Sequence, residues 1–474
     1  MSEIRTRFAP SPTGYLHVGG LRTALYNYLF AKQNNGKFIL RIEDTDQNRK
    51  VENAVENLID SLQWAGLEID EGKGFGGDYG PYVQSERTEL YRKHVQELLD
   101  KGEAYPCFCS AERLAKVKEE TPNSGYDGHC RILSKEKVNK KIAAGEPYVV
   151  RQKVPAGREV VFYDIVRGKV TFASKEIDDQ VLLKSDGFPT YHLANVVDDH
   201  YMKISHVVRG EEWLISTPKH ILLYESFGWK PPKFAHLSLL LNSDKSKLSK
   251  RQGDVSVEDY REKGYLREAL INFLALLGWN PGNDEELFTM KQLIKKFSLK
   301  KVSKSGSIFD VEKLNWMNGQ YIRDLSDEEF IKRAKPFFPK DTGLEADKIT
   351  AILQLFKARI ERLDEIPVKV AIFTSEFPPL EEKAEKALND EMLTVLKFMA
   401  RELTNIENFS GKAFVDTIKK AQKETGVKGK NLWMSARIGI SGQEHGAEIH
   451  LIADILGKEL CIKRINHIIN EYEA

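Results

Sequence analysis

The amino-acid sequence predicts an α/β protein with a doubly wound parallel sheet, an inserted module and an all-helical C-terminal third. Three observations support this prediction. Apolar runs typical of strands alternate with helical stripes over the first hundred residues. A cysteine-containing, β-rich segment interrupts the alternation from about Ala104 to Lys175, and after Ser326 only helical periodicity remains.

The first half of the sheet is predicted from strands and helices in strict order. Ile4 to Phe8 and Lys37 to Ile42 have the composition of strands. A β-α-β-α order of this kind is typical of a parallel sheet covered by helices. Apolar residues spaced at three and four positions predict those helices: Leu21, Ala24, Leu25, Tyr28 and Leu29; Val55, Leu58, Ile59 and Leu62; Tyr91, Val95, Leu98 and Leu99.

An inserted module explains why the alternation stops and later resumes. Tyr148 to Val154 and Val160 to Val166 are β-rich runs inside the interruption. Strand and helix signals return over four segments: Val181 to Lys184, His192 to Asp198, His206 to Arg209 and Thr217 to Phe227. We therefore expect the first half of the sheet domain in residues 1–105, the module in 106–180 and the second half in 181–245.

Helices alone are predicted for the C-terminal third. Ser326 and Glu329 form a capping box in front of an apolar run. Two helical stripes follow: Ile349, Leu353, Phe356, Ile360 and Leu363, and then Leu451, Ile452, Ile455 and Leu456. We expect this helical region to span residues 326–474, with a separate connecting region in residues 246–325.

Composition excludes several classes of protein. The 474 residues carry 71 basic and 70 acidic side chains, which excludes a polybasic binder but permits RNA binding by one basic face. No apolar run approaches the length of a membrane span. The N-terminus opens with Glu3, Arg5 and Arg7 rather than an apolar signal segment, so the sequence predicts a cytoplasmic protein that does not enter a membrane.

A histidine–glycine turn follows the first predicted strand, in the segment from Pro10 to Gly20. Open α/β sheets bind ligands at this place, where a strand ends beside a helix N-terminus. Gly19 and Gly20 would let a nucleotide approach the backbone, and His17 could donate a hydrogen bond to a phosphate oxygen. The alternative is an ordinary strand-to-helix turn with an incidental histidine.

A basic loop, from Lys247 to Arg251, follows the apolar run Leu237 to Leu241. Lysine ammonium groups in such a loop could neutralise charge on the polyphosphate of ATP. Taken alone, a solvated basic loop is the more common reason for this pattern. The histidine–glycine turn and the basic loop together are far more specific than either one.

Together the two motifs resemble those of the class I aminoacyl-tRNA synthetases. Four further segments resemble the bacterial-type glutamyl-tRNA synthetases: Arg41 to Asp46, Pro189 to Asn195, Gly210 to Trp213 and Trp316 to Gly319. The resemblance runs from Arg7 to about Tyr321 and continues more weakly to the C-terminus. It implies a Rossmann-type catalytic domain, an inserted module for the tRNA acceptor end, a stem-contact region and a helical anticodon-binding region.

The resemblance implies a glutamate–tRNA ligase that activates L-glutamate with ATP and Mg²⁺ and transfers it to the 3′-terminal ribose of tRNA(Glu). His17, Lys247 and Lys250 would be its catalytic residues. The implied ATP-binding residues are His17, Gly19, Gly20, Glu212, Lys247, Ser249 and Lys250. The sequence departs from the general class pattern at Gly20, where a second histidine is usual, and at Leu248, where methionine is usual.

The resemblance also implies how glutamate and the tRNA are recognised. The implied glutamate-binding residues are Arg7, Ala9, Ser11, Glu43, Tyr191, Asn195 and Arg209. Arg7 would take the side-chain carboxylate, and such a pocket rejects glutamine because charge-assisted hydrogen bonds are lost. Asp44 and Arg359 are implied tRNA contacts, and Arg359 would favour C over U at the third anticodon base.

Three of the four cysteines, Cys107, Cys109 and Cys130, cluster in the inserted module and suggest a zinc knuckle. Relatives with a Tyr-x-x-x-Cys arrangement imply Tyr126 as the fourth ligand, and His129 is the other candidate. A cluster that has lost its metal is also consistent with the sequence.

Basic and aromatic residues in the helical third suit a module that reads anticodon bases. The candidates form two groups: Lys357, Arg359 and Arg362 on one predicted helix, and Lys428, Lys430, Trp433 and Arg437 in or beside a loop.

Other functions explain less of the sequence. A glutaminyl-tRNA synthetase would end in β-barrels, and a glutamyl-queuosine enzyme would lack the C-terminal third. A catalytically silent tRNA-binding regulator would not need His17 and the loop lysines, and a small-molecule nucleotidyltransferase would not need the inserted module. The sequence leaves open whether tRNA(Gln) is also charged, and the family implies a monomer.

Overall fold

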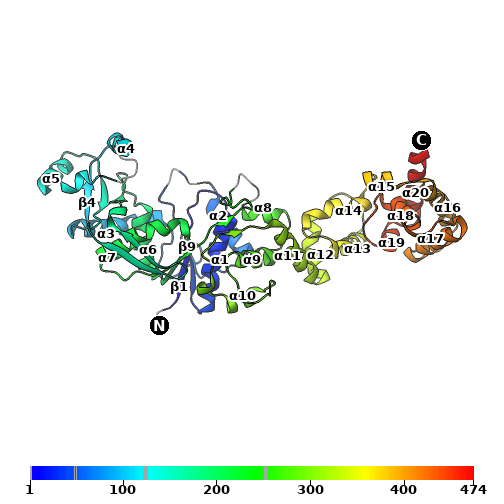
Figure 1. Cartoon of the computed structure of the whole chain (residues 1–474), viewed down its shortest axis with the longest axis horizontal. Helices are drawn as coiled ribbons and strands as arrows, with labels where there is room; N and C mark the ends of the chain where they lie inside the picture. Colours follow the sequence, from blue (N-terminus) through cyan, green and yellow to red (C-terminus); the bar gives the residue numbers. More distant parts are fainter. Residues whose placement is uncertain (1–2, 47–48, 50, 121–125, 250–254, 474) are drawn as a thin grey trace. The chain divides into compact units, whose positions relative to one another are not determined.

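The computed structural model describes residues 3–46, 49, 51–120, 126–249 and 255–473. The chain divides into two compact units, Met1–Arg261 with Arg267–Val311, and Glu262–Leu266 with Glu312–Ala474 (Figure 1). Every strand within the described ranges belongs to the first unit, which confirms that the C-terminal third is helical. Across those same ranges, no helix combines the length and the apolar character that crossing a bilayer requires.

Parallel strands form the centre of the first unit. They are β1 (Arg5–Phe8), β2 (Lys37–Leu40), β3 (Glu71–Gly72), β9 (His206–Gly210) and β10 (Lys233–Leu237). β1 pairs with β2 and β2 with β3 in one sheet, and β9 pairs with β10 in a second. The two sheets adjoin where the amide of Ser205, the residue before β9, donates to the Arg5 carbonyl oxygen at 2.9 Å. This arrangement confirms the doubly wound sheet that the alternating pattern predicts.

Helices cover this sheet and extend its core. They are α1 (Val18–Gln33), α2 (Ala54–Trp64), α3 (Thr88–Asp100), α6 (Tyr191–Tyr201) and α7 (Thr217–Phe227). α1 packs against β1, β2 and β9, while α3, α6 and α7 share one apolar core with β2, β9 and β10 (Figure 1). The sequence stripes locate α1, α2 and α3, whereas α6 is buried at every position from Leu193 to Asp199 and α7 is buried on most sides.

The segment between the two halves of the sheet contains two smaller β structures. β4 (Ala104–Cys107), β5 (Val149–Gln152) and β8 (Val181–Leu183) form an antiparallel sheet, accompanied by α4 (Ala111–Glu120) and α5 (Lys135–Ala143). β6 (Glu159–Asp164) and β7 (Gly168–Ala173) form a hairpin. β6 also pairs in parallel with β10, so this hairpin extends the central sheet.

The first unit ends in short elements around α1. They are β11 (Leu240–Leu241), β12 (Ser307–Ile308), α8 (Val257–Glu262), α9 (Arg267–Leu276) and α10 (Met290–Lys296). α9 and α10 both pack against α1, and β11 pairs with β12. The basic loop therefore leaves the end of β11 close to the N-terminal side of α1, where His17 forms a β-bridge with Ser256.

The second unit is helical. Its helices are α11 (Val311–Asp324), α12 (Asp327–Ala334), α13 (Ala346–Phe356), α14 (Ile366–Thr374), α15 (Glu382–Ala387), α16 (Asp390–Thr404), α17 (Gly411–Thr425), α18 (Gly429–Ser441), α19 (Ile449–Leu456) and α20 (Lys458–Glu473). Ser326 caps α12, since its Oγ accepts a hydrogen bond from the Glu329 amide at 3.2 Å. α16 packs against α17, α18 and α20.

Two helix predictions in this unit are wrong. The stripe that continues to Leu363 predicts one helix, but α13 ends at Phe356 and Ile360 is extended, with φ −115° and ψ 148°. The apolar pattern continues past the helix because Ile360 and Leu363 are buried in a different conformation. The three basic residues at 357–362 therefore do not project from one helix.

The second wrong prediction concerns residues 428–437. Trp433 and Arg437 lie inside α18 (Gly429–Ser441) rather than in or beside a loop, whereas Lys428 immediately precedes this helix, as predicted. The glycine at its first position suggests a turn, but Leu432, Ala436 and Ile438 supply a buried helical face.

Gly411 offers a test of how tightly the second unit packs. A Cβ added at Gly411 would overlap the His450 carbonyl oxygen at the start of α19, so we expect Gly411→Ala to destabilise this unit by about 2 kcal/mol. Gly446→Ala is the matched control, because a Cβ there would lie 3.3 Å from a flexible glutamine side chain. Urea unfolding of both variants measures the difference, and equal midpoints would contradict the prediction.

Candidate active site

A cleft opens where the carboxyl ends of β1 and β9 meet the N-terminus of α1. It consists of two cavities, of about 750 Å³ and about 420 Å³. They adjoin, because both are lined by Gly19, Gly20, Thr23, Gly210 and Glu212. The carboxyl edge of a doubly wound sheet is where ligands bind in this class of fold, so the cleft is the candidate active site.

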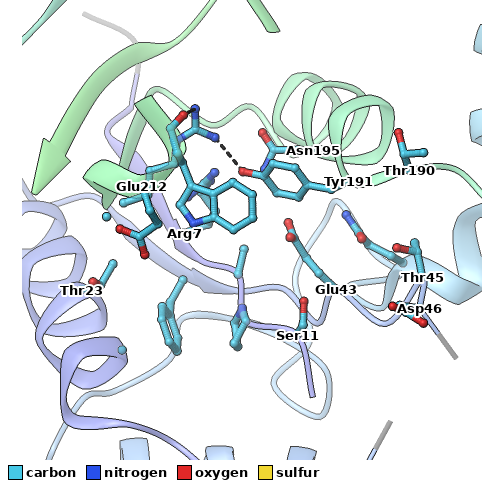
Figure 2. A pocket seen from close by; sticks show the side chains of 18 of the residues that line it. Arg7, Ser11, Thr23, Glu43, Thr45, Asp46, Thr190, Tyr191, Asn195 and Glu212 are labelled. Carbon is cyan, nitrogen blue, oxygen red and sulfur yellow. Dashed lines mark hydrogen bonds between the residues drawn. The ribbon is translucent and has the colours of Figure 1, made fainter. Parts of the chain in front are cut away.

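The larger cavity brings together every residue that the resemblance assigns to glutamate binding. Its walls include Arg7, Ala9, Ser11, Glu43, Tyr191, Asn195 and Arg209. Figure 2 shows Tyr191 and Asn195, from α6, on the opposite side of the cavity from Ser11 and Glu43. These residues are separated by up to about two hundred positions in sequence, and the strands together with α6 bring them to one edge of the fold.

Arg7 is buried and held by a carboxylate behind the cavity. Its Nε and Nη2 donate to the two oxygens of Asp199 at 3.2 and 3.4 Å. Arg41 donates from Nη1 to the same Asp199 at 2.6 Å and from Nη2 to Glu43 at 2.8 Å. Although burial opposes ionisation, Arg7 and Arg41 hold the pKa of Asp199 below its usual range. Burial raises the pKa of Glu43, with Arg41 acting in the opposite direction.

Arg209, at the end of β9, is fixed by neighbours on three sides. It donates from Nη1 to the Tyr191 hydroxyl at 2.7 Å, as Figure 2 shows, and from Nη2 to Thr217 Oγ1 at 2.9 Å. Its Nε donates to His236 Nε2 at 3.1 Å, and His236 Nδ1 lies 2.7 Å from Asp164 Oδ2. Burial lowers the pKa of His236 to about 4, so this histidine is neutral and its Nδ1–H points to Asp164.

The smaller cavity holds the histidine–glycine turn and the described part of the basic loop. It is lined by His17, Lys247, Leu248 and Ser249, whereas Lys250 lies outside the described residues. His17 caps α1, and its Nδ1 accepts from the Gly19 amide at 2.9 Å. In neutral imidazole the proton then sits on Nε2. A helix N-terminus beside a cationic loop is well suited to bind phosphate.

Gly20 has little room for a side chain. A Cβ at this position would approach Leu16 to 3.0 Å and Phe8 to 3.6 Å. The departure from the class pattern at Gly20 is therefore accompanied by close packing of the turn. Glu212, in the 3₁₀ helix Glu211–Ser216, presents its carboxylate to both cavities.

The cysteine cluster lies apart from the cleft and is compact. The sulfurs of Cys107, Cys109 and Cys130 all lie within 4.8 Å of one another. The Tyr126 hydroxyl is 3.4 Å from Cys107 Sγ and 3.6 Å from Cys109 Sγ. His129, by contrast, has an exposed side chain and is not in this group. Three thiols and a phenol in this arrangement fit a four-coordinate zinc ion, with Tyr126 favoured over His129.

The two predicted tRNA contacts have different surroundings. Asp44 is buried, and its oxygens accept from the Ser85 amide at 2.8 Å and from the Ser85 hydroxyl at 2.7 Å. Arg359 is exposed at the end of a 3₁₀ turn and lies close enough to Arg437 to help lower the pKa of Arg437, after burial. Both contacts remain predictions.

Sequence reasoning missed the residues that support the arginines. Asp199, His236 and Thr217 do not occur in any of the recognised motifs. A signal for Asp199 exists: the acidic pair Asp198–Asp199 interrupts an apolar helical segment, and both side chains are buried. Buried carboxylates require cationic partners, so the pair indicates ion pairing in the core.

Comparisons with known proteins agree over the whole chain. Residues 3–316 match the family of class I tRNA synthetases (E and Q), catalytic domain, and residues 329–469 match an anticodon binding domain. The glutamate–tRNA ligase of Finegoldia magna is 48% identical, covering 99% of this chain and 100% of that protein. The glutamate–tRNA ligase of Clostridioides difficile is 47% identical, with 99% of each chain covered. A crystal structure of a glutamate tRNA ligase from Elizabethkingia meningosepticum, in complex with its amino acid, matches with a TM-score of 0.90, 38% identity and 99% coverage of each chain.

Buried neutral histidines of the first unit predict acid sensitivity. Burial lowers the pKa values of His192, His206 and His236 to about 4, from an ordinary value of 6.5. The unfolded chain binds more protons than the folded chain between these values, so stability falls as pH is lowered through this window. We expect the urea midpoint of the first unit to drop between about pH 6.5 and about pH 5, where most carboxyl groups stay ionised. An unchanged or higher midpoint would contradict this.

Proposed function

The chain belongs to the glutamate–tRNA ligases, a family of class I tRNA synthetases, and we propose that it carries out that family's reaction in the cleft described above. L-Glutamate is activated with ATP to glutamyl-adenylate, and the glutamyl group is transferred to the 3′-terminal ribose of tRNA(Glu), with release of pyrophosphate and AMP. The observation that carries the proposal is the larger cavity, which is lined by all of the expected glutamate-binding residues and adjoins the smaller, cationic cavity.

In the larger cavity, Arg7 binds the side-chain carboxylate of glutamate, and Arg209 with Tyr191 binds the α-carboxylate. Glu43 receives the α-ammonium group, whose positive charge favours the ionised form of this carboxylate. Asn195 and Ser11 complete the pocket. Glutamine would leave Arg7 without a charged partner, so the pocket discriminates against it.

In the smaller cavity, the glycine turn at Gly19 and Gly20 receives the nucleoside and Glu212 contacts it. His17 donates from Nε2 to a phosphate oxygen, and Lys247, Ser249 and Lys250 bind the polyphosphate. This assignment is supported by the cationic lining and by the N-terminus of α1.

The chemistry needs no covalent enzyme intermediate. A carboxylate oxygen of glutamate attacks the α-phosphorus, the bond to the β-phosphate breaks and pyrophosphate leaves; Mg²⁺, when bound, would offset the charge of the phosphates. A terminal ribose hydroxyl of the tRNA then attacks the activated carbonyl carbon, and AMP leaves. The residues of the cleft contribute positioning and charge stabilisation.

The tRNA runs along several regions of the chain in this proposal. Residues 106–180 receive the acceptor end, residues 246–325 contact the stem, and residues 326–474 read the anticodon with Arg359. Asp44 contacts the tRNA near the cleft. In this proposal the enzyme acts as a cytoplasmic monomer.

We also propose that Cys107, Cys109, Cys130 and Tyr126 bind a structural zinc ion. The ion would tie β4 to the 3₁₀ turn His129–Ile132, because Cys107 ends that strand and Cys130 lies in that turn. Such a site stabilises the module that meets the acceptor end and takes no part in the chemistry.

Zinc content tests this second proposal. We expect the full-length protein to contain about one zinc equivalent and Cys130→Ser to lose most of it, because a three-ligand site binds weakly. Cys461→Ser is the control, since Cys461 is buried in α20, outside the cluster. Elemental analysis of Tyr126→Phe and His129→Ala distinguishes the fourth ligand. Equal zinc in the native protein and Cys130→Ser would overturn the proposal.

Aminoacylation tests the main proposal. The purified protein should charge tRNA(Glu) with glutamate in the presence of ATP and Mg²⁺, and Lys247→Ala should lower kcat by about a hundredfold, because transition-state charge on the phosphates loses a partner. Lys245→Ala, a change two residues earlier and outside both cavities, should leave kcat nearly unchanged.

The same assay with tRNA(Gln) separates a strict enzyme, which charges tRNA(Glu) alone, from a relaxed one that charges both. Arg359 supports the strict form. A folded preparation that charges neither tRNA would refute the proposed function.

A further inference from the structure

Asp199 is a buried carboxylate placed directly behind the glutamate cavity. It lies in α6, four residues after Asn195, and its side chain has no exposed surface. Among the residues described as lining the two cavities, Asp199 does not appear. Any effect of Asp199 on substrate must therefore act through a neighbour.

That neighbour is Arg7. A guanidinium offers two bidentate edges, one formed by Nε with one Nη and one formed by the two Nη atoms. Asp199 takes the Nε–Nη2 edge of Arg7, at 3.2 and 3.4 Å, and this pairing sets the plane of the group. We propose that Asp199 is the positioning residue that orients Arg7 to receive the side-chain carboxylate of glutamate. The inference rests on the proposed function.

A second contact prevents Asp199 from turning. Arg41, which is fully buried, donates to Asp199 Oδ1 at 2.6 Å and to Glu43 Oε1 at 2.8 Å. The four side chains thus form one chain of alternating charge from Arg7 to Glu43. Asp199 positions Arg7, at the cationic end of the cavity, by direct contact. It positions Glu43, at the anionic end, through Arg41.

Charge balance gives Asp199 a second effect. The positive charges of Arg7 and Arg41 balance the negative charges of Asp199 and Glu43. Although burial raises the pKa of Asp199, Arg7 and Arg41 lower it by more, so Asp199 stays ionised. Without the charge of Asp199, Glu43 would be the nearest remaining carboxylate to Arg41, at 2.8 Å, with Asp198 at 3.9 Å. Glu43 would then pair more closely with arginine and less with the α-ammonium group of the substrate.

Asp199→Asn keeps the size of the side chain and removes the charge. We expect the KM for glutamate to rise about tenfold or more, because an amide cannot accept from both arginines as the carboxylate does. The KM for ATP and kcat at saturating glutamate should stay within about twofold of the native values. The ratio of glutamate to glutamine activation, measured by pyrophosphate exchange with bound tRNA, should fall.

Asp198→Asn is the matched control. Asp198 is the preceding residue of α6 and is equally buried, but its partners are Arg87, Gln84 and Tyr91. Of the four side chains that link Arg7 to Glu43, Asp198 comes nearest to Arg41, with Oδ2 3.9 Å from Nε. This variant should lose stability without a selective rise in the KM for glutamate.

Asp199→Glu provides a second test that keeps the charge. The longer side chain moves the carboxylate and displaces Arg7, so its KM for glutamate should lie between those of the native enzyme and Asp199→Asn. Far-ultraviolet circular dichroism establishes that each variant is folded, and Asp199→Glu decides the question if Asp199→Asn does not fold.

The outcomes separate this inference from the proposed function. If the native protein does not charge tRNA with glutamate, the proposed function fails. If the native protein charges it, and Asp199→Asn alters every kinetic constant equally, alters none, or behaves like Asp198→Asn, then Asp199 does not position Arg7 and the inference is overturned.

Discussion

Burial of arginine at the carboxyl edge of the sheet is the constraint on which the site depends. Arg7 and Arg209 end neighbouring strands, Arg41 follows a third, and all are at most 5% exposed. A guanidinium removed from water is tolerated only with partners that satisfy its charge and its donors. Asp199 and Glu43 provide the charge for Arg7 and Arg41, and the Tyr191 hydroxyl and neutral His236 accept from Arg209. These contacts hold the three guanidinium groups in place without a substrate.

The supporting residues also connect the cleft to the rest of the first unit. Asp164 closes β6, accepts from the Val166 and Arg167 amides, and orients His236 against Arg209. A strand from the segment between the two halves of the sheet thereby holds a residue of the glutamate cavity. This is a physical route by which a change in the β6–β7 hairpin would reach Arg209, through one hydrogen-bonded histidine.

Local sequence patterns identify some elements well and misjudge others. Helices α2 and α3 agree with their apolar spacing, because each buries one regular face, whereas α1, α6 and α7 are buried on most sides. The helix through Ile360 is mispredicted, because Ile360 and Leu363 are buried whether or not the backbone is helical. Likewise, Tyr126 and His129 are both candidates in sequence, and only folding brings the Tyr126 hydroxyl to the thiols.

The sequence by itself determined the fold class, the family and the residues that line the cleft. Motifs such as Pro10 to Gly20 are local. In this fold class, a turn that joins a strand to the N-terminus of a helix lies at the carboxyl edge of the sheet, where ligands bind. The tertiary structure alone decided how those residues are supported. Asp199, His236 and Thr217 act through partners far away in sequence, and ion pairs between buried groups depend on distances in space that no local pattern encodes.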